Sequence, residues 1–293
     1  MVIATSTIKD VPGVSLGHTT HLPERTGCTV LAFDAPTLTA AEVRGAAPGT
    51  RDLDLLAPGR TVQRADAILL TGGSAFGLRA ADGVMQALAN MGRGVPTPAI
   101  PVPIVPAAVI FDLANGQPEV PTVDDGATAF RTAQPLSRAE TGQIGVGTGA
   151  RWGSLLGPEQ SRPGGFAMAQ IEVAGGTVTA FVVVNAFGAI LPEQDPRPLV
   201  LDSLGDNSPF GQNTTLMAVV TDITCGHDVL TRMCVAVHDG MARTIWPSHT
   251  IADGDVAFAS TVNEGPTDPA TVLPLSIATE LAVESAIRSI AAI

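Results

Sequence analysis

The sequence predicts one layered α/β domain. Strand-like runs of apolar or β-branched residues alternate along the chain with segments whose apolar residues recur at helical spacing, and no internal repeat divides them. The 293 residues are 45% apolar, which is enough to bury a sizeable core. A globally disordered chain is excluded because only 15% of the residues are charged.

The N-terminal third predicts two strands and a helix. Residues 26–33 and 66–71 are short, apolar or β-branched, and flanked by turn residues, with a Gly- and Pro-containing loop at 43–52 between them. Residues 74–90 predict a helix from apolar residues at near-helical spacing. These residues are Phe76, Ala80, Val84, Met85 and Leu88.

The next segment is extended and then helical. Prolines at near-alternate positions in residues 96–106 require an extended chain, because proline fixes φ and restricts the residue before it. They lead into an apolar strand at 107–111. Residues 124–133 predict a helix, and residues 142–149 predict a glycine-rich loop.

A hairpin and a long loop follow. Residues 167–173 and 177–184 predict strands that meet across Gly175-Gly176, a pair typical of a hairpin turn. Residues 191–212 show no periodicity and contain scattered Pro, Asp, Asn and Gly. A loop of this length inside a compact domain is unusual, and such loops are commonly functional or disordered.

The C-terminal part predicts two strands and two helices. Residues 214–221 are strongly strand-like, and residues 256–260 predict a second strand. Residues 228–244 have the spacing of an amphipathic helix, and residues 275–291 predict a final helix.

Charge and cysteine content narrow the possible partners. The net charge is −12 and Lys9 is the one lysine, so nucleic acid and anionic membranes are not expected as partners, and a P-loop is excluded. Three cysteines without a CxxC pair, and histidines without metal-ligand spacing, predict buried thiols, no metal site and no cofactor. The chain start lacks a signal-peptide pattern, so a cytoplasmic protein is expected.

The residues with the clearest chemical potential follow the long loop. Asn213-Thr214 stands at the start of a predicted strand, and cleavage of this bond would give Thr214 a free α-amine beside its own hydroxyl. That arrangement is an activated N-terminal nucleophile. Farther on, Asp253 and Asp255 flank a glycine, with His249 nearby, and paired acids can orient an amine or share a proton. By composition alone, an Asn-Thr pair is ordinary at the start of a strand, and the Asp-Gly-Asp segment is most often a polar turn.

Six segments, in order, carry a family resemblance. They are residues 11–17, 71–78, 105–112, 145–150, 213–216 and 247–255. Together they resemble the self-cleaving peptidase family that includes the L-aminopeptidase/D-esterase, the β-peptidyl aminopeptidases and the nylon-oligomer (6-aminohexanoate-oligomer) endo-hydrolase. The Asn-Thr-Thr and His-Thr-x-x-Asp-Gly-Asp segments are most similar to the nylon-oligomer hydrolase branch.

The resemblance implies a fold and a processing event. The fold is a four-layer αββα sandwich of the type shared with ornithine acetyltransferase, with an N-terminal-nucleophile type of site. The single domain, residues 1–293, would be cut between Asn213 and Thr214 into an α-fragment, 1–213, and a β-fragment, 214–293. The processed units would assemble as a homo-oligomer, a tetramer of processed heterodimers.

The resemblance also implies residue roles. Thr214 would be the nucleophile, and Asn185 would donate a hydrogen bond to the oxyanion. Asp253 and Asp255 would position and polarise the nucleophile.

One departure from the family concerns a lysine. The nylon-oligomer hydrolase branch has a catalytic lysine after the Gly-rich loop, and here Ser154 stands at the aligned position with Arg151 close by. Arginine stays protonated, so it cannot shuttle a proton as lysine can. Arg151, Ser154 and Thr250 are therefore accessory candidates.

Three hypotheses for the function follow. The first is a self-processed hydrolase acting on aminopeptide or amino-acid amide bonds, or on 6-aminohexanoate oligomers. The second is an acyltransferase of the ornithine-acetyltransferase type, which would pass the acyl group to an amine. The third is an uncleaved, non-catalytic homologue. In the first two cases the partner is a small-molecule or peptide substrate.

Overall fold

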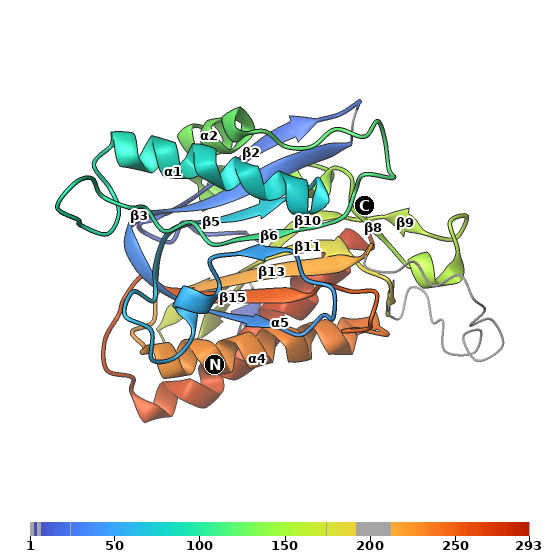
Figure 1. The fold of residues 1–293 in the computed structure, drawn as a ribbon. Coiled ribbons are helices and arrows are strands. Elements are labelled where there is room, and N and C mark those ends of the chain that lie inside the picture. Colours follow the sequence, from blue (N-terminus) through green and yellow to red (C-terminus); the bar gives the residue numbers. More distant parts are fainter. Residues whose placement is uncertain (1–2, 5–6, 24, 174, 192–211, 293) are drawn as a thin grey trace.

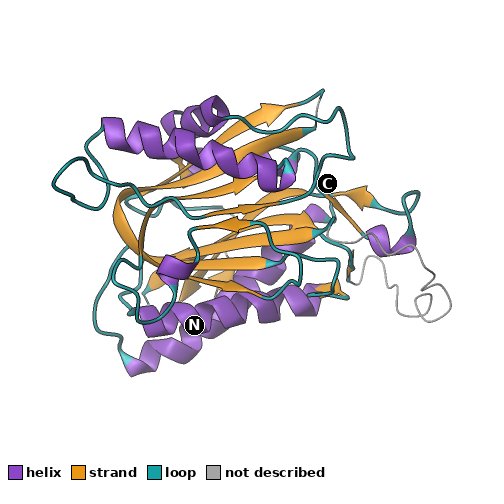
Figure 2. Ribbon diagram, viewed as in Figure 1, coloured by secondary structure: helices purple, strands orange, loops and turns teal. Residues whose placement is uncertain are grey.

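Helices cover both outer faces of a stack of strands. The computed structural model describes residues 3–4, 7–23, 25–173, 175–191 and 212–292. In this part of the chain, α1 (Ala80–Asn90) and α2 (Val123–Arg131) lie on one side, and α4 (His227–Thr244) and α5 (Pro269–Ile290) lie on the other (Figure 1). Figure 2 shows the strands in two layers between the helix pairs. The predicted αββα sandwich is confirmed.

Most of the strands join one hydrogen-bonded path. The longest is β3 (Thr26–Val43). The others are β1 (Ile3–Ala4), β2 (Val14–His21), β4 (Thr50–Arg51), β5 (Arg64–Thr71), β6 (Ala107–Val109), β7 (Gln134–Pro135), β8 (Arg151–Trp152), β9 (Arg162–Pro163), β10 (Gly165–Val173), β11 (Gly176–Asn185), β12 (Ala189–Ile190), β13 (Thr214–Thr221), β14 (Ile245–Trp246) and β15 (Val256–Thr261). The path runs β1-β10-β11-β13-β15-β3-β5-β6-β4, and β2 pairs with β3.

β3 connects the two strand layers. Its first half pairs with β2 and β5, whereas residues 38–43 pair antiparallel with β15. The register with β5 shifts between Ala32 and Thr37, where the strand has an irregularity. Such irregularities bend a strand and increase its twist. β3 therefore carries the chain from one layer into the other.

Three separate apolar cores fill the spaces between the four layers. The core between the two strand layers is the one that holds the buried phenylalanines Phe33, Phe166, Phe181 and Phe258. The core under α4 and α5 is mostly aliphatic and includes Val237 and Leu275. The third core, under α1 and α2, includes Val84 and Leu88. Each helix pair thus covers a sheet face with its own apolar side chains.

β13 is buried on both faces. Leu216, Ala218 and Val220 belong to the core between the strand layers, while Met217 and Val219 belong to the core under α4 and α5. A strand buried on both sides is a nearly continuous apolar run, which is why the sequence predicts this strand over the same residues, 214–221. Its first residue is Thr214.

The predicted helix at 74–90 is only partly α-helical. Residues 74–79 form a 3-10 helix, and α1 begins at Ala80. Phe76, one of the residues at helical spacing, is 69% exposed and does not lie on a buried helical face. The chain turns tightly before α1, because a Cβ at Gly77 would lie 1.9 Å from the Gly72 carbonyl oxygen.

Other boundaries also differ from the prediction. α5 begins at Pro269 rather than at 275, since the Asp268 side chain caps the helix by accepting from the Ala270 N–H. β2 is a strand that the sequence did not indicate, and β3 extends through the residues that precede the predicted loop at 43–52. The loop predicted at 191–212 lies almost entirely outside the described residues.

α5 is long and apolar enough, by length and composition, to cross a bilayer, and it is the one described helix of this kind. One side of it is buried in this structure. Leu275, Val283 and Ile287 belong to the core that α4, β10 and β11 share. The same length and composition are found in the core helices of soluble proteins.

Candidate active site

The start of β13 brings the predicted site residues together. β13 pairs antiparallel with β11 and parallel with β15, and Thr214 is directly opposite Asn185 in the register with β11. The residue before it, Asn213, forms an isolated parallel bridge with Asp253. Asn185, Asn213, Thr214 and Asp253 are all buried.

The Asn213 carbonyl group, which belongs to the peptide bond predicted to be cleaved, accepts two hydrogen bonds. The Thr214 Oγ1 hydroxyl donates to the Asn213 oxygen at 2.5 Å, and the Gly254 N–H donates to the same oxygen at 2.9 Å. The Asn213 N–H donates to the Ala252 carbonyl at 3.2 Å. The nucleophile candidate therefore lies beside a carbonyl group that a backbone donor already polarises.

Gly254 can approach this closely because it has no side chain. A Cβ at this position would lie 2.8 Å from Thr214 Oγ1 and 2.5 Å from the Ala47 carbonyl oxygen. The segment after β3 also packs against it, since the Ala47 N–H donates to the Asp253 carbonyl at 2.9 Å. The glycine between the two acids is thus required by the packing around Thr214.

Asp253 accepts hydrogen bonds with both carboxylate oxygens. Its Oδ1 accepts from the Phe187 N–H at 3.1 Å, and its Oδ2 accepts from the Thr250 N–H at 3.1 Å and the Thr250 hydroxyl at 2.5 Å. Burial raises the pKa of Asp253 to about 6, and the charge of Asp255 adds to this effect. Thr250, an accessory candidate, acts on Asp253 rather than on Thr214.

Asp255 connects Thr215 to His249. Its Oδ1 accepts from the Thr215 N–H at 2.7 Å, and its Oδ2 accepts from the His249 N–H at 3.1 Å. The His249 ring Nδ1 is 2.8 Å from the same Oδ2. His249 has a φ of +55°, in the left-handed region that is unusual for a residue other than glycine. The acid is therefore held between β13 and this histidine.

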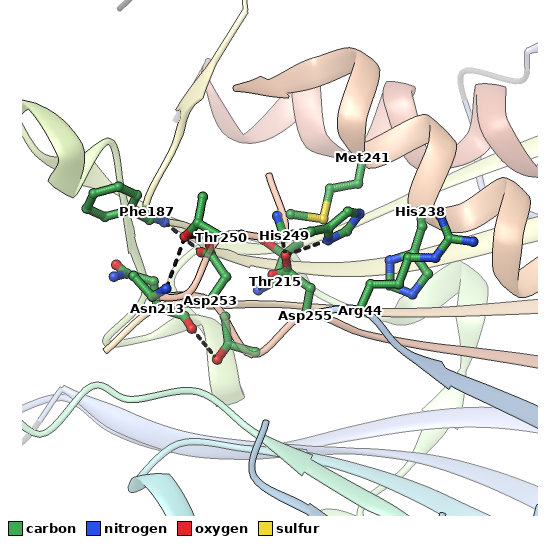
Figure 3. Close-up of polar contacts among 12 residues, drawn as sticks. Arg44, Phe187, Asn213, Thr215, His238, Met241, His249, Thr250, Asp253 and Asp255 are labelled. Carbon is green, nitrogen blue, oxygen red and sulfur yellow. Dashed lines mark hydrogen bonds and ion pairs between the residues drawn. The ribbon is translucent and has the colours of Figure 1, made fainter. Parts of the chain in front are cut away.

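His249 packs edge-on against a second histidine. The ring centroids of His249 and His238 are 4.8 Å apart, and Figure 3 shows both rings on the side of Asp255 that faces away from Asp253. Burial lowers the pKa of His238 to about 3, and the neighbouring His249 contributes to this shift. The sequence indicated that His249 lies near the acids, but it gave no sign that His238 belongs to the same site.

Asn185 faces the chain just before the predicted cleavage point. Its Nδ2 donates to the Gln212 carbonyl at 3.4 Å and to the Phe111 carbonyl at 3.3 Å. Its Oδ1 accepts from the Arg151 N–H at 3.0 Å, which fixes the orientation of the amide. In the continuous chain the amide donors of Asn185 are thus engaged by backbone carbonyls, one of them from the residue before Asn213.

Arg151 and Ser154, the two accessory candidates near the position of the family lysine, bond to different parts of the structure. The Arg151 guanidinium bonds to Ser161, with Nε 3.0 Å from the Ser161 hydroxyl and Nη2 2.5 Å from its carbonyl oxygen. It has no hydrogen bond to Thr214, Asn213 or the acid pair among the described residues. The Ser154 hydroxyl instead donates to the Asn213 Oδ1 at 2.7 Å. Ser154 is therefore in the site, whereas the Arg151 side chain is turned toward the β8–β9 hairpin.

The glycine-rich motifs converge on a buried carboxylate next to the site. Asp112 accepts from the Gly73 N–H at 2.7 Å and from the Thr26 hydroxyl at 2.8 Å, and a Cβ at Gly149 would lie 2.7 Å from the Asp112 Cβ. Burial raises the pKa of Asp112 to about 6. These glycines allow close packing and supply backbone donors.

Backbone donors are the part of the site that sequence reasoning missed. The Gly254 N–H and the Phe187 N–H contact the Asn213 carbonyl and Asp253, respectively, and neither has a side-chain signal. The glycine of Asp-Gly-Asp was the one available indication. No cluster of three or more His, Cys, Asp or Glu side chains arranged to hold a metal occurs among the described residues.

Comparison with known proteins identifies the family. The model of peptidase family S58 matches residues 6–292. The chain belongs to peptidase family S58. An uncharacterized aminopeptidase of Mycobacterium tuberculosis (strain ATCC 25618 / H37Rv) is 37% identical over 318 residues, covering 98% of this chain and 90% of the relative.

Two further comparisons, one with a named relative and one with a solved structure, concern the activity and the fold. A 6-aminohexanoate-oligomer endohydrolase of Kocuria sp. (strain KY2) is 30% identical over 276 residues, covering 87% of this chain and 74% of the relative. The structure of the L-aminopeptidase D-Ala-esterase/amidase of Ochrobactrum anthropi, described as a variant of the Ntn-hydrolase fold, has a TM-score of 0.72 at 16% identity. That match covers 94% of this chain and 83% of the other. This member of family S58 is accordingly a hydrolase with the Ntn-type fold.

Proposed function

We propose that this S58 hydrolase cleaves its own Asn213–Thr214 bond and then uses Thr214 as an N-terminal nucleophile against amide substrates. The observation that carries the proposal is the arrangement around one carbonyl group. The Thr214 hydroxyl and the Gly254 N–H both lie on the Asn213 oxygen, at 2.5 and 2.9 Å. A hydroxyl beside the carbonyl and a fixed donor on its oxygen are what an acyl shift requires.

Self-cleavage would proceed in two steps. Thr214 Oγ1 attacks the Asn213 carbonyl carbon, and the Gly254 N–H stabilises the developing oxyanion. The peptide C–N bond breaks, and the hydroxyl proton ends on the Thr214 nitrogen, which leaves an ester between Asn213 and Thr214. Water then adds across the ester, giving a carboxyl group on Asn213 and restoring the Thr214 hydroxyl. The products are fragments 1–213 and 214–293.

Turnover would use the amine that self-cleavage releases. The free α-amine of Thr214 accepts the hydroxyl proton as Oγ1 attacks the substrate carbonyl, and this proton then passes to the leaving amine. Once residue 212 no longer occupies it, the Asn185 Nδ2 is free to donate to the oxyanion. An oxyanion donor of this kind typically contributes about 3–4 kcal/mol to transition-state stabilisation. Water finally hydrolyses the acyl ester on Thr214.

The acid pair would hold the new N-terminus. Asp253 forms a backbone bridge with the residue before Thr214, and the Asp255 carboxylate accepts from the N–H of the residue after it, so both acids would lie close to the released ammonium. An ammonium beside buried carboxylates is electrostatically favourable and would be fixed in orientation. This accounts for two buried acids at the start of a strand.

The substrate class follows from the relatives and from charge. The relatives are named as aminopeptidases and 6-aminohexanoate-oligomer endohydrolases, so amides with a free amino end are the proposed substrates. A net charge of −12 favours cationic over anionic substrates at long range. We further propose a tetramer of processed heterodimers, as the family resemblance implies, located in the cytoplasm.

The decisive experiment is fragment analysis combined with turnover. Purified protein is separated on a denaturing gel, its fragments are weighed by intact mass spectrometry, and hydrolysis is assayed with aminoacyl-p-nitroanilides, β-aminoacyl amides and 6-aminohexanoate oligomers. We expect two fragments, the smaller beginning at Thr214, and release of free acid. A fully active preparation that contains only the intact chain would contradict the proposal. Product that partitions to added amines would indicate an acyltransferase.

A further inference from the structure

Ser154, which stands where the nylon-oligomer hydrolase branch has a lysine, contacts the residue before the proposed cleavage point. Ser154 begins the short 3-10 turn Ser154–Leu156 that follows β8, and its hydroxyl donates to the Asn213 Oδ1 at 2.7 Å. Among the described residues this is the one side-chain hydrogen bond to the Asn213 amide. Ser154 thus bonds to the residue that supplies the carbonyl group, and it has no hydrogen bond with Thr214.

The turn that carries Ser154 is tied to the segment after Asn185. The Gly153 N–H donates to the Ala186 and Gly188 carbonyls at 3.2 and 2.9 Å, and the Leu155 N–H donates to the Phe187 carbonyl at 3.0 Å. Gly153 has a φ of +76°, which lets the chain turn there. The Phe187 N–H in turn donates to Asp253. The hydroxyl of Ser154 is therefore placed by the same segment that holds the acid.

Asn213 is held through its backbone as well as its side chain. Its N–H donates to Ala252, and its carbonyl oxygen accepts from Gly254 and Thr214. Its Nδ2 is buried and has no hydrogen-bond partner among the described residues. An unpaired buried amide nitrogen does not favour one side-chain conformation, so the bond from Ser154 is the polar contact that selects it.

We propose that Ser154 is a positioning residue for self-cleavage: its hydroxyl holds the Asn213 side chain and thereby keeps the Asn213 carbonyl oriented toward Thr214 Oγ1. This inference rests on the proposed self-cleavage. A serine hydroxyl is neutral and donates one hydrogen bond, so it does not replace the charge or the proton shuttle of a lysine. The Ser154 hydroxyl acts in the uncut chain, and its role ends when the 213–214 bond breaks.

The test measures the half-life of the precursor. Chains are made in a short cell-free translation, translation is stopped, and the intact and cleaved species are followed over time on denaturing gels. Ser154→Ala should lengthen the half-life about tenfold, the size expected for loss of one neutral hydrogen bond. Ser154→Thr keeps the hydroxyl and should restore most of the rate. Ser161→Ala removes another hydroxyl of the β8–β9 hairpin, one that contacts Arg151 and not Asn213, and should leave the half-life unchanged.

A double-mutant cycle shows whether Ser154 acts through Asn213. Asn213→Ala should slow cleavage by a similar factor, and the double variant should be no slower than the slower single variant, because each removes the same bond. A structural effect of Ser154 would instead multiply with the effect of Asn213→Ala and would lower the thermal unfolding midpoint. Mass spectrometry of the α-fragment checks the chemistry, since attack by the Asn213 amide on its own carbonyl would leave a fragment lighter by one water.

Different results would overturn the proposed self-cleavage and the proposed role of Ser154. If the wild-type chain is never cut at 213–214, the proposed function is wrong and the role of Ser154 falls with it. If the wild-type chain is cut and Ser154→Ala is cut equally fast, only the positioning role is overturned. Multiplicative effects in the cycle, or no rescue by Ser154→Thr, overturn it as well.

Discussion

Asn185 and Thr214 are directly paired residues of two adjacent antiparallel strands, and the Asn185 Nδ2 donates to the Gln212 carbonyl at 3.4 Å. The strand register thus places a carboxamide donor beside the nucleophile candidate. Until the peptide before Thr214 moves away, the chain's own carbonyl occupies that donor. The same strand pairing can therefore serve a precursor and a processed enzyme.

Removing this donor should affect turnover. We expect Asn185→Ala to lower kcat by about 10²–10³-fold, the usual effect of deleting one oxyanion donor. The measurement is steady-state hydrolysis per processed chain. Asn263→Ala removes an amide at the opposite end of the sheet, where its Nδ2 donates to the Asp222 carbonyl, and serves as the control. Equal kcat for Asn185→Ala and the wild type would remove Asn185 from the oxyanion site.

Thr214 should be needed for both reactions. Thr214→Ala removes the hydroxyl that attacks, so we expect an intact chain without measurable hydrolysis. Thr214→Ser keeps a hydroxyl and should be cut and active at a reduced rate. Thr132→Ala at the end of α2 is the matched control, since its hydroxyl only bonds to the Thr128 carbonyl. Cleavage of Thr214→Ala at the same bond would identify a different nucleophile.

Asp253 should impose a pH dependence on stability. Because its pKa is raised to about 6, the folded protein binds a proton that the unfolded chain releases near 3.8. Its contribution to the free energy of unfolding is therefore largest at low pH and is lost as the pH rises from about 4 to about 6. Denaturant unfolding of the uncut Thr214→Ala chain, with and without Asp253→Asn, isolates this contribution.

In the difference between the two chains, the contributions of the titratable groups that both chains share cancel. The difference in unfolding free energy between parent and Asp253→Asn should change across pH 4–6 and stay constant above it. A difference that is flat across this window would show that Asp253 titrates normally.

His249 should act through its bond to Asp255. His249→Ala removes the ring Nδ1 contact, and a hydrogen bond to a charged group is worth enough that kcat should fall about tenfold or more. His249→Asn should retain most activity, because asparagine tolerates a φ of +55° and its amide can donate to the same oxygen. His227→Ala at the start of α4 controls for loss of a histidine elsewhere. If the asparagine variant is as impaired as the alanine variant, the hydrogen bond is not what matters.

The parts of the fold that the sequence predicts are those with strong periodicity. The run at 214–221 indicates a strand because β13 is buried on both faces, and the spacing at 228–244 matches α4. β2 escaped prediction because polar residues such as His18 and Thr20 interrupt its alternation. Residues 74–79 show helical spacing, but the close approach of Gly77 to Gly72 favours a tight 3-10 turn.

The candidate site divides in the same way. Thr214, Asp253 and His249 could be singled out from chemistry-bearing side chains, and Asn185 from a resemblance. The Gly254 N–H could not, because every residue but proline has such a donor and only the fold selects one. Ser154 and Arg151 were equal candidates in sequence, and the orientation of the two side chains distinguishes them.

The bend of β3 and the central place of β13 have a consequence for the two polypeptides that a cut at 213–214 would create. β13 and β15 belong to the shorter piece, yet β13 pairs with β11 and β15 pairs with β3, both from the longer one. α5, also from the shorter piece, packs against β10 and β11. The strands β13 and β15 of the shorter fragment would lie between β11 and β3 of the longer fragment in one sheet. A cut before Thr214 would therefore create a new chain end without allowing the two fragments to separate.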